Sequence, residues 1–300
     1  MFDNKKLLPP NGKIDVILDT DPYNEIDDQY AIAYLLKNKE RLNTIGFCAA
    51  PFFNSRSSSP ADGMKKSYDE IKKLLSILEI TDIPVLLGSE RYLQDENTPV
   101  CSPAAEFIIE SAKKYTGDNP LYIVAIGAIT NVASALLICP QIQNNIVVVW
   151  LGGNERSLDS TKEFNMIQDI SAARVVMKSG VPFVQLPCRG VVDDFIVTKK
   201  QLCEELFNTT AIANYLVEST VKYCDDKGTG KDFERVIWDV TAIGWLLNEE
   251  NDFVSFSVVD TLLPDYNGHM EKKTLPDKMG YVTKIHSDKL RKDLFMKLAQ

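Results

Sequence analysis

Ile14-Asp15-Val16-Ile17-Leu18-Asp19-Thr20-Asp21-Pro22-Tyr23-Asn24-Glu25-Ile26-Asp27-Asp28 is the stretch from which the rest of the chain can be interpreted. Its apolar run, 16–18, predicts a buried strand that ends in acids, and the pattern after Asp28 predicts a helix. In open α/β sheets, ligands bind outside the carboxyl ends of the strands. Asp19, Asp21, Asp27 and Asp28 would repel one another there unless a cation lay among them.

Each of these aspartates also has a purely structural interpretation. Asp27 can cap the helix, Asp28 is favourable in its first turn, and Asp19 and Asp21 are common turn residues. Four acids within ten positions at a strand-to-helix junction nevertheless favour a hard cation. Its ligands would be oxygens, which suits calcium or magnesium rather than zinc.

Composition narrows the class of protein. The chain has 300 residues, 45% of them hydrophobic, so it can bury a large core. Its net charge of −9 argues against a nucleic-acid backbone or an anionic membrane as the main partner. The polar start at 1–10 and the lack of an apolar run of membrane length lead us to expect a cytoplasmic protein. The six cysteines show no zinc or redox spacing, and two histidines give little support for a histidine-based site.

Apolar segments alternate with helical patterns, which is typical of βαβ units and a parallel sheet. Strands are predicted at 14–19, 44–49, 84–87, 121–126, 146–151 and 182–186, with late strands at 253–259 and 280–285. Helices are predicted at 27–37, 65–78, 103–114, 131–138, 171–178, 199–207, 211–225 and 235–247, and a surface loop at 54–63. We therefore expect a single α/β domain, 1–300, with a central mostly parallel sheet flanked by helices.

Asp239 is the most informative acid outside the first stretch. It lies in Arg235-Val236-Ile237-Trp238-Asp239-Val240-Thr241-Ala242, an apolar helical pattern. A carboxylate is expensive to bury there unless it is paired or bound to a metal. The preceding Trp238 is either a core residue or a ligand contact.

Together these stretches resemble the inosine–uridine-preferring nucleoside hydrolases. Where the family has Asp-x-Asp-Pro-Gly-x-Asp-Asp, this chain has a turn that is two residues longer, 23–26, and that lacks the glycine. Further matches follow in the family's order, from about residue 14 to 247: Asn54, Gly127-Ala128-Ile129-Thr130-Asn131, Glu163-Phe164-Asn165 and Trp238-Asp239. The resemblance implies a Rossmann-like fold, a nucleoside substrate and a homodimer or tetramer.

The resemblance also implies roles for single residues. A calcium ion would be held by Asp21, Asp28, Asp239 and the main-chain carbonyl of Ile126, where the family usually has threonine. Asp21 would be the general base for an attacking water. The side chains expected to contact the nucleoside are Asp27, Asn54, Asn154, Glu163, Asn165 and Trp238. Asn54 is interpreted equally well as a loop asparagine that makes its own turn. Asn154 is the candidate for the family's additional loop asparagine, in a loop before Glu163 that is shorter than the family's.

The implied activity is hydrolysis of the N-glycosidic bond of ribonucleosides to ribose and free base. Trp238 stands where the purine-specific branch has a tryptophan that stacks on the base, which favours purine nucleosides. One alternative is a phosphatase of the haloacid dehalogenase type, which also has Asp-x-Asp after a strand, although Pro22 and Tyr23 do not supply its usual Thr or Val. The other is a nucleoside-binding protein without turnover, suggested by the altered turn and by Ile126.

Overall fold

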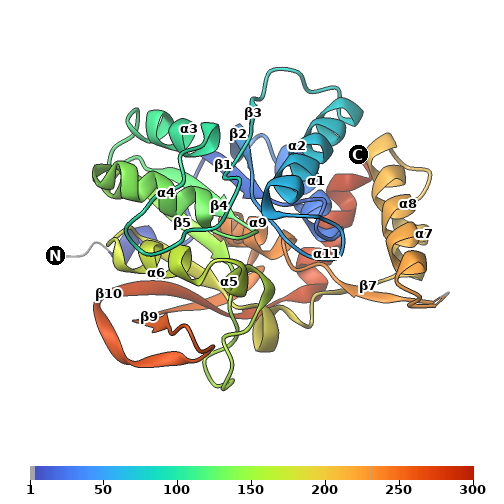
Figure 1. Ribbon diagram of the computed structural model, residues 1–300. Helices are drawn as coiled ribbons and strands as arrows, with labels where there is room; N and C mark the ends of the chain where they lie inside the picture. The colour runs from blue at the N-terminus through green and yellow to red at the C-terminus, as the bar shows by residue number, and fades with distance from the viewer. Residues whose placement is uncertain (1–3, 231) are drawn as a thin grey trace.

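A computed structural model describes residues 4–230 and 232–300 of the chain. Its central sheet has eight strands in the order β3-β2-β1-β4-β5-β6-β10-β9 (Figure 1). The strands are β1 (Ile14–Thr20), β2 (Leu42–Ala49), β3 (Val85–Leu86), β4 (Leu121–Ala125), β5 (Ile146–Leu151), β6 (Phe183–Leu186), β9 (Val254–Pro264) and β10 (Met270–Ile285). Neighbouring strands are parallel, except that β9 and β10 form an antiparallel hairpin at the edge. The predicted mostly parallel α/β sheet is confirmed.

Helices cover both faces of this sheet (Figure 1). Along β1, Val16 and Leu18 face one core, whereas Ile17 faces the other. The first core is covered by α1 (Asp27–Lys37), α2 (Pro60–Ile77), α8 (Ala211–Asp226), α9 (Val240–Leu246) and α11 (Ser287–Leu298). The second is covered by α3 (Pro103–Ala112), α4 (Thr130–Ile138) and α6 (Ile170–Lys178). Because both faces are buried, the central strands are apolar throughout rather than alternating.

Shorter elements complete the chain. They are α5 (Phe164–Gln168), α7 (Lys199–Glu205), α10 (Asn248–Asn251), 3-10 turns at Asn4–Leu7 and Pro140–Asn144, and a helical turn at Cys188–Val192. A second, two-stranded antiparallel sheet joins β7 (Ile196–Thr198) to β8 (Glu234–Val236). It lies beside α7 and α8 in Figure 1.

Four predictions about elements were wrong. The late strand at 253–259 continues to Pro264. The helix at 235–247 is divided, because 234–236 pairs with β7 and only Val240–Leu246 is helical. The serine-rich loop ends four residues early, since Ser59 caps α2 and accepts a hydrogen bond from the Asp62 N–H. The late strand at 280–285 begins at Met270, because its exposed first half continues the pairing with β9.

The strand order determines where a crevice opens. The connections from β1 run outward through β2 to β3 on one side, and outward from β4 on the other, so the topology switches between β1 and β4. Asp21 follows β1 and Gly127 follows β4 at this point. A methyl group on Gly127 would lie 2.9 Å from Asp21 Oδ1, so the two loops are in close contact. A ligand site is expected at their ends.

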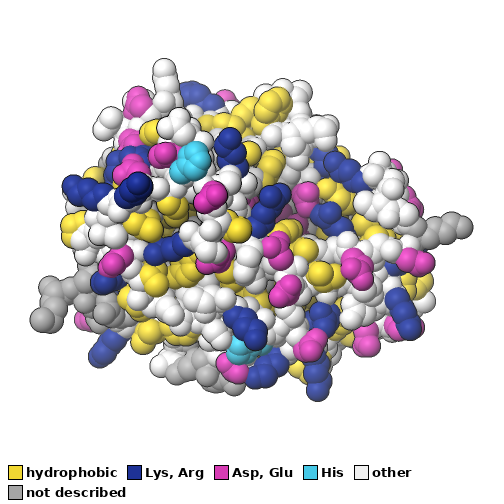
Figure 2. All heavy atoms as spheres, turned by 90° about the horizontal axis from the view of Figure 1, so that it is seen from below, with side chains coloured by type: hydrophobic (Ala, Val, Ile, Leu, Met, Phe, Trp, Pro, Cys, Tyr) yellow, Lys and Arg dark blue, Asp and Glu magenta, His cyan; other side chains and the backbone are white. Residues whose placement is uncertain are grey.

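The distribution of charge on the surface bears on the partners that the net charge argues against. On the face shown in Figure 2, basic and acidic side chains are interspersed rather than gathered into a basic stripe. A basic stripe is the footprint of proteins that bind nucleic-acid backbones. In the part of the chain that the structure describes, none of the helices combines the length and hydrophobicity needed to cross a bilayer.

Candidate active site

Three carboxylates from distant parts of the chain meet at the switch point. Asp27 and Asp28 begin α1, and Asp239 directly precedes α9, which packs against α1. One carboxylate oxygen of each lies within 4.8 Å of the other two, and all three residues are buried. We call Asp27, Asp28 and Asp239 the acid cluster. Capping does not explain it, because Ile26 occupies the N-cap of α1 and Asp239 makes no capping hydrogen bond.

Asp21 lies beside the cluster and is also buried. Its backbone N–H donates to Asp28 Oδ1 at 3.1 Å, and the Thr20 hydroxyl donates to the same oxygen at 2.5 Å. Both carboxylate oxygens of Asp21 are buried without a hydrogen-bond partner among the residues described. A buried polar atom without a partner costs free energy, so a cation or a donor bound at these two oxygens would stabilise the site.

Burial and mutual repulsion raise the pKa values of these acids. Burial raises the pKa of Asp21 well above its usual range, and the negative charges of Asp28 and Asp27 add to it. The pKa of Asp27 rises to about 7 through burial and the charges of Glu25 and Asp28. Burial raises the pKa of Asp28 to about 6, an effect that the Thr20 hydroxyl partly offsets. The pKa of Asp239 is raised by burial and by the other two acids of the cluster.

This donor set fits a hard divalent cation. All of its side-chain donors are carboxylate oxygens, the ligands that calcium and magnesium prefer. A cation among them would remove the repulsion and satisfy the two bare oxygens of Asp21. Of the expected ligands, Asp28 and Asp239 converge, and the third acid of the group is Asp27, which was expected to contact the nucleoside, whereas Asp21 lies outside the group.

The carbonyl of Ile126 faces the same pocket. The Asn165 side-chain amide donates to this oxygen at 3.1 Å and to the carbonyl oxygen of Leu151 at 2.9 Å. Asn165 thereby links the ends of β4 and β5. Since a carbonyl oxygen has two lone pairs, that of Ile126 can still accept a second partner.

Glu163 is the N-cap of α5. Its carboxylate accepts hydrogen bonds from the backbone N–H groups of Gly153 at 2.7 Å, Asn165 at 2.9 Å and Met166 at 3.0 Å. Burial raises its pKa, and these bonds partly offset that effect. The acid therefore stabilises the loop between β5 and α5 while lining the pocket.

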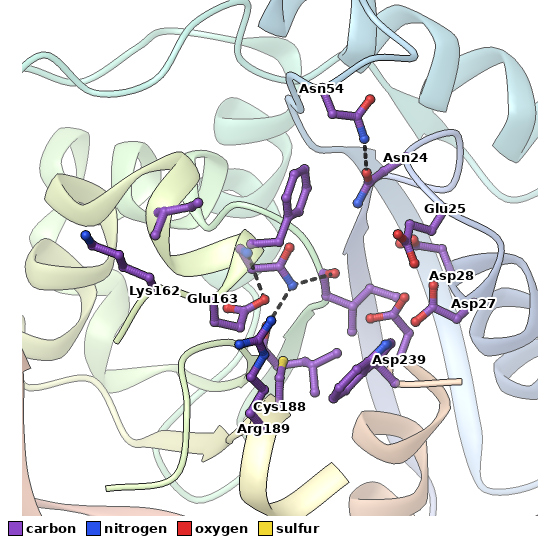
Figure 3. Close-up of a pocket in the computed structure, with 16 residues that line it drawn as sticks. Asn24, Glu25, Asp27, Asp28, Asn54, Lys162, Glu163, Cys188, Arg189 and Asp239 are labelled. Carbon is purple, nitrogen blue, oxygen red and sulfur yellow. Dashed lines mark hydrogen bonds between the residues drawn. The ribbon is translucent and has the colours of Figure 1, made fainter. Parts of the chain in front are cut away.

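A pocket of about 410 Å³ opens above the acid cluster (Figure 3). The predicted residues that line it are Asp27, Asp28, Asn54, Ile126, Glu163, Asn165, Trp238 and Asp239. Asp21 is not in the lining, although its N–H donates to the lining residue Asp28. Asn154 is not in the lining either, and its side-chain amide donates to the Ser160 carbonyl at 2.8 Å. The structure thus brings most of the expected residues to one pocket, with Asp21 and Asn154 outside its lining.

Asn54 and Trp238 each have contacts within the protein and also line the pocket. Asn54 Oδ1 accepts the N–H of Arg56 at 2.8 Å, so the residue makes its own turn. Its amide also donates to Asn24 Oδ1 at 2.6 Å across the pocket mouth. Trp238 is half-buried and packs on the core of the α1 side, yet it also contributes to the pocket wall.

The longer turn at 23–26 places Glu25 in the pocket wall. Arg235 Nη2 donates to Glu25 Oε2 at 2.5 Å, and the Tyr223 hydroxyl donates to Glu25 Oε1 at 3.1 Å. These partners come from β8 and α8. The extra turn residues are therefore tied to the second half of the chain.

Sequence reasoning missed several lining residues. They are Asn24, Glu25, Leu151, Lys162, Phe164, Ile167, Cys188 and Arg189. Some had a usable signal: Lys162 and Phe164 flank Glu163, and Arg189 follows the carboxyl end of β6. The rule that ligands bind beyond strand ends points to Arg189 as well as to the aspartates.

Fold and site define an α/β protein with a pocket at its switch point, lined by a group of buried carboxylates that could hold a metal ion. The chain belongs to the inosine-uridine preferring nucleoside hydrolase family, which matches residues 16–290. This family match places it among the nucleoside hydrolases.

Named relatives were found both by sequence and by structure. A probable uridine nucleosidase of Arabidopsis thaliana is 26% identical over 232 residues, which are 70% of each chain. A probable ribonucleoside hydrolase of Dictyostelium discoideum is 36% identical over 91 residues, but only 28% of this chain and 27% of that protein are aligned. The solved structure of a purine-preferring ribonucleoside hydrolase from Gardnerella vaginalis has a TM-score of 0.72 at 19% identity. The match covers 95% of this chain and 98% of that one.

Proposed function

We propose that the protein hydrolyses the N-glycosidic bond of ribonucleosides, with calcium bound at the acid cluster. The observation that carries this proposal is the buried Asp21, whose two unpartnered oxygens lie beside three converging carboxylates. Such an arrangement matches the needs of a reaction in which water attacks a sugar carbon that develops positive charge. Family membership favours this activity over the phosphatase alternative.

The residues that would hold calcium are Asp21, Asp28, Asp239 and the Ile126 carbonyl. Bound calcium would lower the pKa of a nearby water and would coordinate vicinal hydroxyl groups of the sugar.

Asp21 is the proposed general base, because neither of its carboxylate oxygens has a hydrogen-bond partner among the residues that the structure describes. It accepts the proton of the attacking water, and general-base catalysis of this kind contributes about 10²- to 10⁴-fold in rate. Asp27, a member of the acid cluster, accepts a ribose hydroxyl and keeps the ring oriented for attack. The cluster's negative charge stabilises the cationic sugar as the bond to the base breaks.

Trp238 is the proposed platform for the leaving base. Its ring is half-buried in the pocket wall next to Asp239, where an aromatic face can stack on a purine. Neither histidine of the chain is near this position in sequence, so an imidazole is not the proposed acid for the leaving group. Purine preference is tested by comparing kcat/KM for inosine and for uridine, and a clear preference for uridine would contradict it.

Release of free base from inosine, followed by chromatography with calcium and with EDTA, tests the activity itself. We expect turnover with calcium, little with EDTA, and a loss of about 10²- to 10⁴-fold in kcat for Asp21→Asn. An exposed acid in an ion pair with Lys65 provides the matched control, Asp69→Asn, which should keep full activity. Calorimetric binding of inosine without any base release would instead favour a nucleoside-binding protein.

A further inference from the structure

Two cationic side chains line the pocket on the side away from the acid cluster. Figure 3 shows Arg189 and Lys162 on the Glu163 side, with the Lys162 ammonium pointing outward and with Asp239 and the rest of the cluster across from them. Both cationic side chains are exposed. A pocket for a neutral nucleoside needs carboxylates and amides for hydroxyl groups, but it has no need of two positive charges. Their presence therefore requires an explanation.

Neither cationic group has a partner in the described part of the chain. Within residues 4–230 and 232–300, the guanidinium of Arg189 and the ammonium of Lys162 have no ion pair and no hydrogen bond. The neighbouring acid, Glu163, already accepts three backbone hydrogen bonds. By contrast, Arg235, which is outside the pocket lining, is paired with the lining residue Glu25.

The backbone holds both residues in place. The Arg189 carbonyl accepts the N–H of Glu155 at 2.9 Å, and the next N–H, of Gly190, donates to Asp193 Oδ2 at 2.7 Å. The stem of Lys162 lies against Gly268 of the β9–β10 turn, where an added methyl group would come within 2.6 Å of Lys162 Cε. Both side chains thus start from fixed positions at the pocket, and only their charged ends remain free.

We propose that Arg189, assisted by Lys162 at the rim, binds an anionic group carried by the nucleoside. This inference rests on the proposed function. A phosphate on the sugar or a carboxylate on the base would each supply acceptor oxygens for the planar guanidinium. With the ribose hydroxyls at the acid cluster, such a substituent lies across the pocket, on the Arg189 side.

The test compares charged and uncharged forms of the same substrate. The ratio of kcat/KM for inosine 5′-monophosphate to that for inosine reports a sugar phosphate, and the ratio for orotidine to uridine reports a base carboxylate. We expect one ratio to exceed 1 in the native protein and to fall about tenfold or more in Arg189→Met, because charge-assisted hydrogen bonds are lost. Lys162→Met should lower the same ratio less, because an ammonium is a point charge without the paired donors of a guanidinium.

A charge-matched control is Lys39→Met. Lys39 is exposed and follows the C-terminal end of α1, a helix whose 11 residues span about 16 Å and which begins at Asp27. Both ratios should therefore stay at native values. Equal ratios in the native protein and in Arg189→Met would overturn the inference, as would a native protein that favours neither anionic substrate.

Binding measured by calorimetry separates this inference from the proposed function. Ribose 5-phosphate, compared with ribose, and orotate, compared with uracil, are titrated into the calcium-loaded protein. Tighter binding of one charged probe that is lost in Arg189→Met supports the anion site even if no base is ever released. Base release from uncharged nucleosides without any advantage for a charged probe would refute the anion site and leave the hydrolase activity standing.

Discussion

Replacement of Asp28 by asparagine tests the cation site directly. The native carboxylate accepts hydrogen bonds from the Thr20 hydroxyl and the Asp21 N–H, and it adds a negative charge beside two other buried acids. Asparagine keeps an oxygen for both donors but removes the charge. Without a cation, Asp28→Asn should therefore fold at least as well as the native protein, since repulsion is relieved.

With calcium, the native protein should become more stable than Asp28→Asn. A cation that binds only the folded state at 100 times its Kd stabilises that state by about 2.7 kcal/mol. For 300 residues, an unfolding entropy of about 2.1 cal/mol/K per residue gives about 0.63 kcal/mol/K. The native Tm should then rise by about 4 °C with calcium, whereas that of Asp28→Asn should rise by less than about 1 °C.

Differential scanning calorimetry in EDTA and along a calcium series measures both effects, with Asp69→Asn as the control for loss of one surface carboxylate. Asp28→Asn should also release no base from inosine. A calcium response of about 4 °C that persists in Asp28→Asn, or an active variant, would show that Asp28 is not a ligand.

Three further predictions concern positions around the site and away from it. Gly127→Ala should lower kcat/KM about tenfold, measured by base release, because its methyl group must displace the Asp21 carboxylate, 2.9 Å away, by a few tenths of an ångström. Burial raises the pKa of Glu96, but hydrogen bonds from Lys178 and Arg174 outweigh it and lower the pKa to about 2. This stabilisation is present above the unfolded pKa of about 4.5 and is lost as the pH falls towards 2. Urea unfolding should therefore show Glu96→Gln about 1–2 kcal/mol less stable at pH 7, with the difference closing below pH 4. Thr198→Ala removes the capping box of α7 and should cost about 1 kcal/mol in the same assay while leaving base release unchanged.

Local patterns were sufficient for the strands β1 to β6 of the central sheet and for the acids that follow β1. The helix at 27–37 was predicted with its observed bounds, and Asp21 was expected at a strand end because acids that follow an apolar run mark such ends. Asp239 was recognised because a carboxylate within an apolar pattern needs a partner. Its setting was nevertheless wrong, since it precedes a helix rather than lying inside one.

The missed features depend on contacts between distant residues. Residues 234–236 look helical beside the apolar run that follows, and only pairing with 196–198 makes them a strand. The first half of β10 is exposed and rich in lysine, so no buried face reveals it. The ion pair between Arg235 and Glu25 joins residues 210 positions apart, which no window of sequence contains.

That ion pair explains how the site accommodates a turn that departs from the family's spacing. The two extra residues bring Glu25 towards the acid cluster, where its charge, after burial, contributes most to raising the pKa of Asp27. An added acid at a crowded cation site would be destabilising by itself. Arg235 offsets the cost, because it binds Glu25 at 2.5 Å and its own charge lowers the pKa of Asp27. The longer turn and Arg235 therefore act as one unit, in which the cation on β8 makes the altered turn compatible with the cluster.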